Sequence, residues 1–111
     1  MSDKIKNVLD DYSSETKKIF GKKLKKIILF GSYARGDYDL ESDIDIMILV
    51  DMTDDEVRQK NKVFCEFNVD LDIENNIFLS PIIINYDHFY KWLPVYPFYK
   101  NVINEGVILY E

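Results

Sequence analysis

The sequence predicts an α/β (α+β) fold in which helices pack against a small β-sheet, and three observations carry this prediction. Apolar residues recur at helical spacing from residue 3 to about residue 20. Two short apolar runs, 25–30 and 42–50, have the length and composition of strands. A second helical stripe begins after Thr53. The 111 residues are enough for one ordinary hydrophobic core, so we expect a single domain over 1–111.

The first helix is expected to pack one apolar stripe against the sheet. The stripe consists of Ile5, Val8, Leu9, Tyr12, Thr16, Ile19 and Phe20. Gly21 follows it as a stop signal. The strand 25–30 then ends at Gly31, which forces a turn, and Gly31 and Ser32 open a short helix. The run 42–50 is apolar on both faces beyond its first residues, which is typical of a central strand.

The second half of the chain predicts three more helices and two strands. Thr53 and Glu56 match a capping box, and the helix that they begin is expected to end within 71–75. A strand follows at 77–84, and Pro81 places it at a sheet edge or a bulge because proline cannot donate a ladder hydrogen bond. The remaining elements are short helices at 87–92 and 98–105 and a short edge strand at 107–110.

Composition and charge exclude several classes of protein. Hydrophobic residues make up 47% of the chain and charged residues 31%, which is the balance of a globular protein and not of a disordered or membrane-embedded one. The single cysteine, Cys65, permits no internal disulfide and is expected to pack near the apolar stripe of its helix. The start of the chain lacks the apolar stretch of a signal peptide, so we expect a cytoplasmic protein. A net charge of −6 argues against stable nucleic-acid binding, which needs a basic surface.

Asp43 and Asp45 are the strongest candidates for a metal site. They lie two residues apart at the start of a predicted strand, so both side chains leave the same face. Neighbouring unpaired carboxylates repel each other, and their burial costs several kcal/mol unless a cation compensates. Mg²⁺ prefers such ligands and completes its shell with water and substrate phosphates. The nearby acids Asp37, Asp39 and Glu41 need no such explanation, because they lie in a predicted loop.

Gly31 and Ser32 predict a phosphate-binding turn next to this pair. A glycine turn lets a phosphate approach the backbone, and free N–H groups together with the serine hydroxyl favour an anion. Arg35 lies in the same turn, where it either meets a phosphate or pairs with Asp37 or Asp39. The phosphate site and the metal pair therefore fall on adjacent strands, which is the layout of metal-assisted phosphoryl or nucleotidyl transfer.

Other interpretations of these residues fail on spacing. Gly31 and Gly36 have the separation of a Walker A motif, but Asp37 and Tyr38 stand where lysine and serine or threonine are needed. The acidic run also breaks the EF-hand pattern, which needs a glycine where Ile48 stands. The sequence has neither the histidine pair nor the cysteine cluster of a zinc site.

Three sequence blocks resemble the signature of the DNA polymerase β-like nucleotidyltransferase superfamily: Gly31-Ser32, Ala34-Arg35-Gly36 and Ser42-Asp43-Ile44-Asp45-Ile46. The likeness is greatest to the small prokaryotic minimal nucleotidyltransferases (MNT proteins) and is strongest over 26–50. The segment 97–111 is similar to the closing segment of many MNT proteins.

The resemblance implies a mixed sheet flanked by helices and the Mg²⁺-dependent transfer of a nucleoside monophosphate from a nucleoside triphosphate. On this chain, Asp43 and Asp45 would be the catalytic metal ligands, and Gly31 and Ser32 would hold the triphosphate. MNT proteins commonly pair with a HEPN-domain toxin and can transfer AMP from ATP to a tyrosine of that partner, which blocks the toxin. The resemblance therefore implies an antitoxin that uses ATP and Mg²⁺, with a HEPN-domain protein as its partner.

The family's third carboxylate has no counterpart at its expected place. In the family it lies on a later strand, facing the aspartate pair, and serves as a metal ligand or general base. The corresponding strand here, 77–84, contains no acid, and Ser80 stands near the expected position. Asp70, Asp72 and Glu74 lie just upstream, and one of them could swing in.

Two alternative functions stay open. The first is a degenerate nucleotidyltransferase fold that acts only as a protein-binding antitoxin module. Its surface could come from aromatic residues that belong either to the core or to an interface: Phe89, Tyr90, Trp92, Tyr96, Phe98 and Tyr99. The second is transfer to a small molecule such as an aminoglycoside, for which 111 residues leave little room for a substrate domain. The sequence does not specify the acceptor, the base preference or the oligomeric state.

Overall fold

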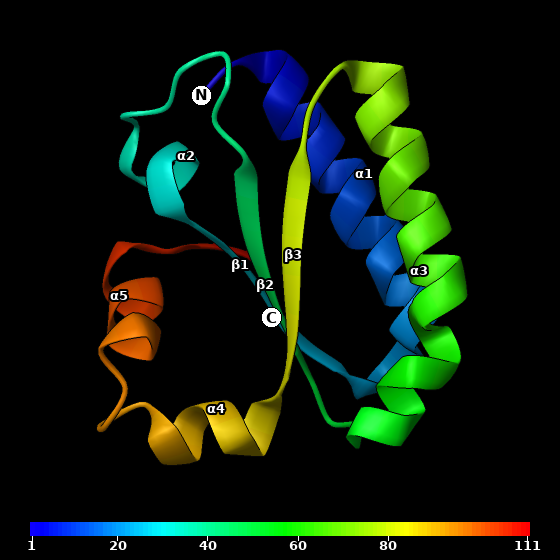
Figure 1. The fold of residues 1–111 in the computed structure, drawn as a ribbon, viewed down its shortest axis with the longest axis vertical. Helices are drawn as coiled ribbons and strands as arrows, with labels where there is room; N and C mark the ends of the chain where they lie inside the picture. The colour runs from blue at the N-terminus through cyan, green and yellow to red at the C-terminus, as the bar shows by residue number, and fades with distance from the viewer.

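The computed structural model describes residues 1–111, with helices on both sides of a four-stranded sheet (Figure 1). The helices are α1 (Asp3–Phe20), the 3₁₀ helix η1 (Gly21–Lys23), α2 (Gly31–Arg35), α3 (Asp54–Asn75), α4 (Tyr86–Trp92) and α5 (Pro97–Glu105). The strands are β1 (Leu24–Phe30), β2 (Ile44–Val50), β3 (Leu79–Asn85) and β4 (Val107–Tyr110). None of the helices combines the length and the apolar composition that crossing a lipid bilayer requires.

The four strands lie in the order β3-β2-β1-β4. β1 runs antiparallel to both β2 and β4, whereas β2 runs parallel to β3. β2 is therefore a central strand, as its apolar faces predict, and β3 is an edge strand, as Pro81 predicts. The expected fold class, a small mixed sheet flanked by helices, is confirmed.

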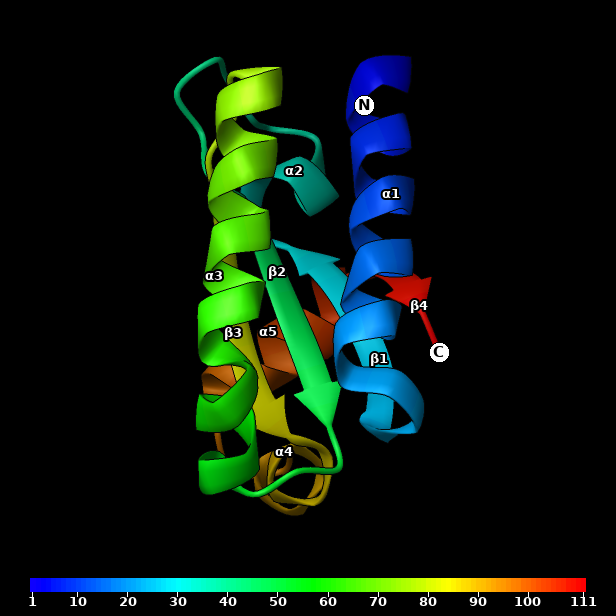
Figure 2. The same cartoon turned by 90° about the vertical axis from the view of Figure 1, so that its right-hand side faces the viewer.

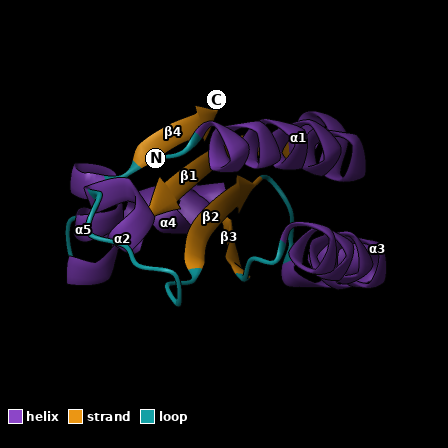
Figure 3. Cartoon of the chain, turned by 90° about the horizontal axis from the view of Figure 1, so that it is seen from above, coloured by secondary structure: helices purple, strands orange, loops and turns teal.

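Successive side chains of β2 point to opposite faces of the sheet and therefore contribute to two separate hydrophobic cores. One set of side chains faces α1 and α3, which cover the side of the sheet seen in Figure 2: Ile44, Ile46, Ile48 and Val50. Met47 and Leu49 face the opposite side, where α4 and α5 pack (Figure 3). Asp45 is two residues before Met47, so its side chain lies on this second side, which we call the α4/α5 face.

Two strands begin later than the sequence predicts. β2 begins at Ile44 and not at residue 42, because Ser42 is held in a turn. The Asp39 N–H donates to the Ser42 hydroxyl at 3.0 Å, and the Ser42 N–H donates to the Asp39 carbonyl at 3.3 Å. Asp43 consequently lies just before the strand and is exposed. β3 likewise begins at Leu79 and not at residue 77.

The expectation that Cys65 packs near the apolar stripe of its helix is wrong, because its side chain is exposed. Phe64 and Asn68 supply the buried positions of α3, and Cys65 lies about 100° around the helix from Phe64. The aromatic residues of the C-terminal third are divided between core and surface. Phe89 and Tyr99 are buried, whereas Tyr96 is 41% exposed and Phe98 is 44% exposed.

A buried hydrogen bond joins α1 to α3. The Tyr12 hydroxyl donates to the Asn68 Oδ1 atom at 2.9 Å, and the Asn68 Nδ2 atom donates to the Phe64 carbonyl at 2.7 Å. Tyr12 has no exposed surface, and its burial raises the pKa of its hydroxyl, so the group stays a neutral donor.

We expect Tyr12→Phe to lower the free energy of unfolding by about 1–2 kcal/mol, because the Asn68 oxygen then stays buried without a donor. The melting temperature should fall by about 5–10 °C in calorimetry. Tyr96→Phe is the control, since Tyr96 is exposed. Equal melting temperatures for the two variants would contradict the role of the Tyr12 hydroxyl.

Candidate active site

A tight turn at Gly31 brings the backbone against the Asp45 carboxylate. β1 ends at Phe30, and Gly31 begins α2 with φ +72°, a conformation that glycine adopts freely and other residues adopt at a cost. A Cβ atom placed on Gly31 would overlap the Asp45 Oδ2 atom and lie 3.1 Å from its Cγ. Glycine is therefore required here both by the backbone conformation and by the close approach.

Asp45 lies in the middle of the sheet, between Phe30 of β1 and Ser80 of β3. Its carboxylate is half-buried, and no ion pair in the structure includes it or Asp43. Burial first, and then the charge of Asp43, raise the pKa of Asp45, while Arg35 acts in the opposite direction. The structure thus brings together two neighbouring carboxylates that no basic side chain neutralises by direct contact.

Repulsion between Asp43 and Asp45 should lower the free energy of unfolding of the ligand-free protein at neutral pH. A carboxyl whose pKa is raised in the folded state binds protons more tightly there than in the unfolded chain, so its ionisation destabilises the fold. Asp45→Asn removes that charge and should raise the melting temperature by about 2 °C at pH 7, a small shift because solvent screens the half-buried group. The advantage should shrink as pH falls from neutral toward the raised pKa of Asp45, where the wild-type carboxyl takes up its proton. A variant that melts below the wild type at pH 7 would contradict this electrostatic assignment.

Ser32 and Arg35 lie on the same short helix as Gly31. The Ser32 carbonyl accepts hydrogen bonds from the Gly36 N–H at 2.9 Å and the Asp37 N–H at 3.2 Å, which closes the helix. Arg35 forms ion pairs with Asp37 at 3.2 Å and with Glu105 of α5 at 3.3 Å. Of the two partners considered for Arg35 from the sequence, Asp37 is found and Asp39 is not.

The pairing of Arg35 with Glu105 could not be foreseen from sequence spacing, because the two residues are 70 positions apart. It holds α2 against α5 beside a cavity of about 250 Å³ whose lining includes Gly31 and Asn101. Both ion pairs of Arg35 are exposed, so each is weak in water. Arg35 therefore needs little free energy to exchange an aspartate or glutamate oxygen for a phosphate oxygen.

No acid occupies the sheet position next to Asp45. Ser80 pairs with Asp45 in the register of β2 and β3, so both side chains lie on the α4/α5 face. Asp72 instead belongs to α3, on the other face, and accepts a hydrogen bond from the Leu79 N–H at 2.9 Å. Burial and the charge of Asp43 raise the pKa of Asp72, although this hydrogen bond opposes the shift. Asp72 thus anchors the start of β3.

The donor set fits a hard divalent cation. No three Asp, Glu, His or Cys side chains lie close enough together to hold a metal ion by themselves. Asp43 and Asp45 nevertheless offer carboxylate oxygens that no ion pair occupies, and the Asp45 carboxylate lies against the Gly31 turn. Mg²⁺ is commonly bound by one or two carboxylates, with water and substrate phosphates as the other ligands. The carboxylates of Asp43 and Asp45 therefore fit Mg²⁺ as ligands.

Sequence comparison defines the class of protein that this fold and site represent. A family model for the nucleotidyltransferase domain matches residues 9–108, so the chain belongs to the nucleotidyltransferase domain family. Two relatives come from Methanocaldococcus jannaschii. The one named "Putative protein adenylyltransferase MJ0604" is 35% identical over 102 residues, which are 92% of this chain and 94% of that protein. The one named "Putative protein adenylyltransferase MJ0141" is 38% identical over 100 residues, which are 90% and 93% of the two chains.

Solved structures share the fold at lower sequence identity. A structure described as a toxin–antitoxin with AMP-PNP superposes with a TM-score of 0.57 at 22% identity, over 91% of this chain and 72% of that one. A variant of the toxin–antitoxin MntA-HpeT superposes with the same TM-score at 20% identity and the same coverage. These likenesses support the fold independently of the sequence match.

Proposed function

We propose that this protein is a Mg²⁺-dependent nucleotidyltransferase that transfers AMP from ATP to a hydroxyl group of a partner protein. The partner in this proposal is a HEPN-type toxin, the acceptor is a tyrosine of that toxin, and the modification makes the protein an antitoxin. The observation that carries the proposal is the pair of neighbouring carboxylates without an ion pair, Asp43 and Asp45, of which Asp45 lies against the Gly31 turn. The proposal treats residues 1–111 as one catalytic domain.

The similar proteins support the finer parts of the proposal. Both M. jannaschii relatives carry the name of a protein adenylyltransferase, and each aligns over nearly its whole length. The structural neighbours are described as toxin–antitoxin complexes, one of them with the ATP analogue AMP-PNP. A protein acceptor and an adenine nucleotide are therefore the first substrates to examine.

Each candidate residue has a distinct task in this reaction. Asp43 and Asp45 would hold Mg²⁺, which when bound neutralises the triphosphate and lowers the pKa of the attacking hydroxyl. The missing side chain at Gly31 leaves room for the Asp45 carboxylate against the turn. The Ser32 hydroxyl and free backbone N–H groups of the turn would donate to phosphate oxygens. Arg35 would leave Asp37 or Glu105 to pair with the triphosphate. Ser80 cannot act as a carboxylate base, so no side chain of β3 would take up the proton of the acceptor hydroxyl.

The proposed AMP transfer can be tested by labelling ATP at one phosphate at a time and following where the label goes. The purified protein, Mg²⁺ and the HEPN-type partner are incubated with ATP labelled either at the α-phosphate or at the γ-phosphate. Nucleotidyl transfer predicts that the α-label becomes attached to the partner, that the γ-label does not, and that pyrophosphate is released in equal amount. Attachment of the γ-label would indicate phosphoryl transfer, and attachment of neither would contradict the proposed activity.

A second function is favoured by one observation, the serine at the sheet position next to Asp45. The fold would then act as a binding module that neutralises the toxin by covering it. Toxin neutralisation that survives loss of both Asp43 and Asp45 would support this alternative, whereas neutralisation that requires them and ATP would exclude it.

A further inference from the structure

The cavity beside the Arg35–Glu105 ion pair lies next to the Asp45 carboxylate, and we call it the α5 cavity. Its volume is about 250 Å³, and its lining includes Gly31, against which the Asp45 carboxylate lies. Phe30 also lines it and stands opposite Asp45 in the register of β1 and β2. Opposite residues of two antiparallel strands point to the same face of the sheet, and Phe30 packs with the core on the α4/α5 face. A ligand held at Asp45 and the Gly31 turn can therefore extend into this cavity.

Phe98 presents an aromatic ring on the α5 side of the cavity. The residue is 44% exposed even though its ring meets the Phe30 ring at an angle of 73°, with the ring centroids 5.6 Å apart. Val102, one helical turn further along α5, is buried and also lines the cavity. The contact with Phe30 orients the Phe98 ring, and the exposed part of the ring is available for a planar ligand. Aromatic side chains stack on nucleic-acid bases in this way, because every base has a π-face.

Asn101 adds a hydrogen-bond donor and an acceptor to the same wall. It follows Phe98 by three residues in α5, so the two side chains are neighbours on one side of the helix, and both line the cavity. The carboxamide offers an N–H donor beside a carbonyl acceptor. Adenine has the complementary pair, an amino group beside a ring nitrogen, and asparagine commonly recognises it through two hydrogen bonds. This wall therefore combines a stacking surface with a group that can recognise the edge of a base.

The charges of the lining favour an uncharged group over a phosphate. Arg35 and Glu105 are the charged lining residues, and they pair with each other at 3.3 Å. Asp37, the other partner of Arg35, does not line the cavity, so Arg35 can exchange Asp37 for a phosphate oxygen and keep Glu105. The triphosphate would then lie at the Gly31 turn, outside a cavity whose own charges cancel.

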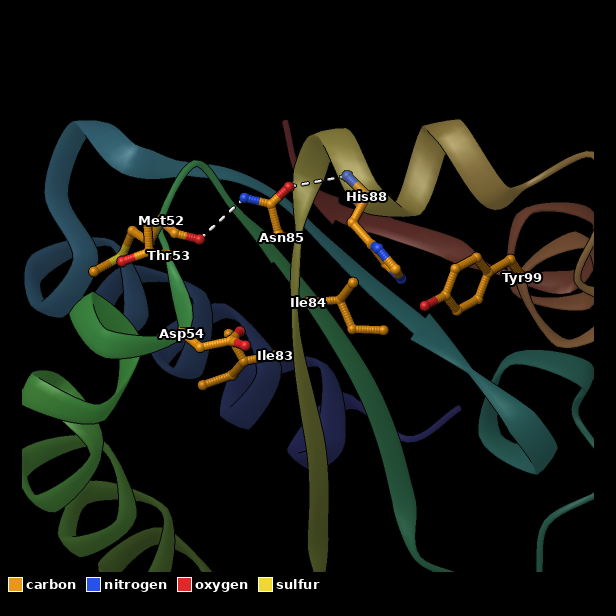
Figure 4. Close-up of a pocket in the computed structure, with 8 residues that line it drawn as sticks. All are labelled: Met52, Thr53, Asp54, Ile83, Ile84, Asn85, His88 and Tyr99. Carbon is orange, nitrogen blue, oxygen red and sulfur yellow. Dashed lines mark hydrogen bonds between the residues drawn. The ribbon is translucent and has the colours of Figure 1, made fainter.

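A larger cavity, of about 490 Å³, lies at the other end of β3 (Figure 4). Asn85, one of its lining residues, is five positions along the strand from Ser80, the partner of Asp45, which is a distance of roughly 16 Å. Neither Gly31 nor Arg35 lines it. Of the two cavities, only the α5 cavity adjoins the turn that is proposed to hold the triphosphate.

We propose that the α5 cavity binds the base of the nucleoside triphosphate, which stacks on Phe98 while Asn101 forms hydrogen bonds to its edge. For adenine, the amino group donates to the Asn101 Oδ1 atom, and a ring nitrogen accepts from the Nδ2 atom. Phe98 and Asn101 thus favour ATP over nucleotides with other bases. The identity of the nucleotide rests on the proposed function, whereas the location of its base can be measured without transfer.

Two probes separate binding of the base from binding of the phosphates. α,β-Methylene-ATP keeps the base but cannot transfer AMP, because a P–C bond replaces the bond that would break, and inorganic tripolyphosphate has no base. In calorimetric titrations with Mg²⁺, Phe98→Leu should weaken binding of α,β-methylene-ATP about tenfold and Asn101→Leu about fivefold. Binding of tripolyphosphate should change less than about twofold in both variants. Equal losses for the two probes, or no loss for α,β-methylene-ATP, would overturn the proposal.

Asn104→Leu is the matched control for Asn101→Leu. Asn104 is also exposed on α5 but does not line the α5 cavity. The control should bind both probes as the wild type does, and a loss equal to that of Asn101→Leu would contradict a specific contact. Phe98 and Asn101 are themselves exposed, so their variants should fold with melting temperatures close to that of the wild type.

Asn101→Asp should change the base preference. A carboxylate only accepts hydrogen bonds, so it keeps one of the two bonds to adenine but can accept both adjacent N–H donors of guanine. The ratio of the affinity for α,β-methylene-GTP to that for α,β-methylene-ATP should rise about tenfold over the wild type. The added charge acts on both triphosphates alike and cancels in this ratio. The same ratio in Asn101→Asp and in Asn104→Asp would contradict contact between Asn101 and the base.

These measurements also separate the base site from the proposed function. Base-selective binding by a protein that transfers no AMP would contradict the proposed activity and support the base site. Transfer of AMP by Phe98→Leu and Asn101→Leu with an unchanged KM for ATP and a raised KM for the acceptor protein would assign the cavity to the acceptor and overturn the base site. A wild type that binds neither probe would contradict both proposals.

Discussion

Replacement of both Asp43 and Asp45 by asparagine is expected to abolish AMP transfer. The variant keeps the size of the two side chains but removes both negative charges, of which that of Asp45 lies against the Gly31 turn. A metal ion supplies several kcal/mol of charge stabilisation in such reactions, so the rate should fall by a factor on the order of 1,000. The measurement is the initial rate of α-label incorporation at saturating ATP and Mg²⁺.

The matched control is the double variant Asp37→Asn with Asp39→Asn. It removes the same net charge from the adjoining loop, where Asp37 pairs with Arg35 and Asp39 holds the turn at Ser42. Its rate should stay within about threefold of the wild type, because exposed charges contribute little. Equal losses of rate in the two double variants would indicate a general charge effect and would contradict a metal site at Asp43 and Asp45.

Gly31→Ala is the second substitution for which we expect a large effect. The left-handed backbone at Gly31 alone should cost about 1–2 kcal/mol of folding free energy. The added methyl group also overlaps the Asp45 carboxylate, which must move away from its position beside the turn. Displacement of a catalytic group by about 1 Å can cost about 100-fold in rate, so transfer should fall by that factor in whatever fraction remains folded.

Gly21→Ala separates the effect of the backbone conformation from the effect of the overlap with Asp45. Gly21 also has a positive φ, +63°, but a Cβ atom there would meet nothing within 4 Å. Both variants should therefore lose stability in denaturant unfolding because of the backbone conformation, and only Gly31→Ala should also lose transfer activity. Comparable activity in the two variants would show that the approach of Gly31 to Asp45 has no catalytic importance.

Local patterns predicted most of the fold. Three elements were predicted from residues within them, and each is found. The apolar stripe predicted α1, the capping box at Thr53 and Glu56 predicted the start of α3, and Pro81 predicted that β3 lies at an edge of the sheet or at a bulge. The turn at Gly31 and the closeness of Asp43 to Asp45 could also be predicted, because both depend on residues close together in the chain.

Contacts between distant segments were not predictable in the same way. Arg35 meets Glu105 only because α5 packs beside α2, and Asp72 meets the Leu79 N–H only because β3 follows α3 closely. The cavity of about 490 Å³, lined by Asn85, His88 and Tyr99 among others, likewise depends on the packing of α4 and α5 near the end of β3. Spacing within one segment contains no signal for any of these contacts.

A crystal structure of the protein with AMP-PNP and Mg²⁺ provides the sharpest measurement. We expect a metal ion about 2.1 Å from oxygen atoms of both Asp43 and Asp45, with phosphate oxygens completing its shell and the triphosphate against Gly31 and Ser32. Nucleotide bound away from Gly31, or bound at Gly31 with no ion on either carboxylate, would contradict the proposed active site.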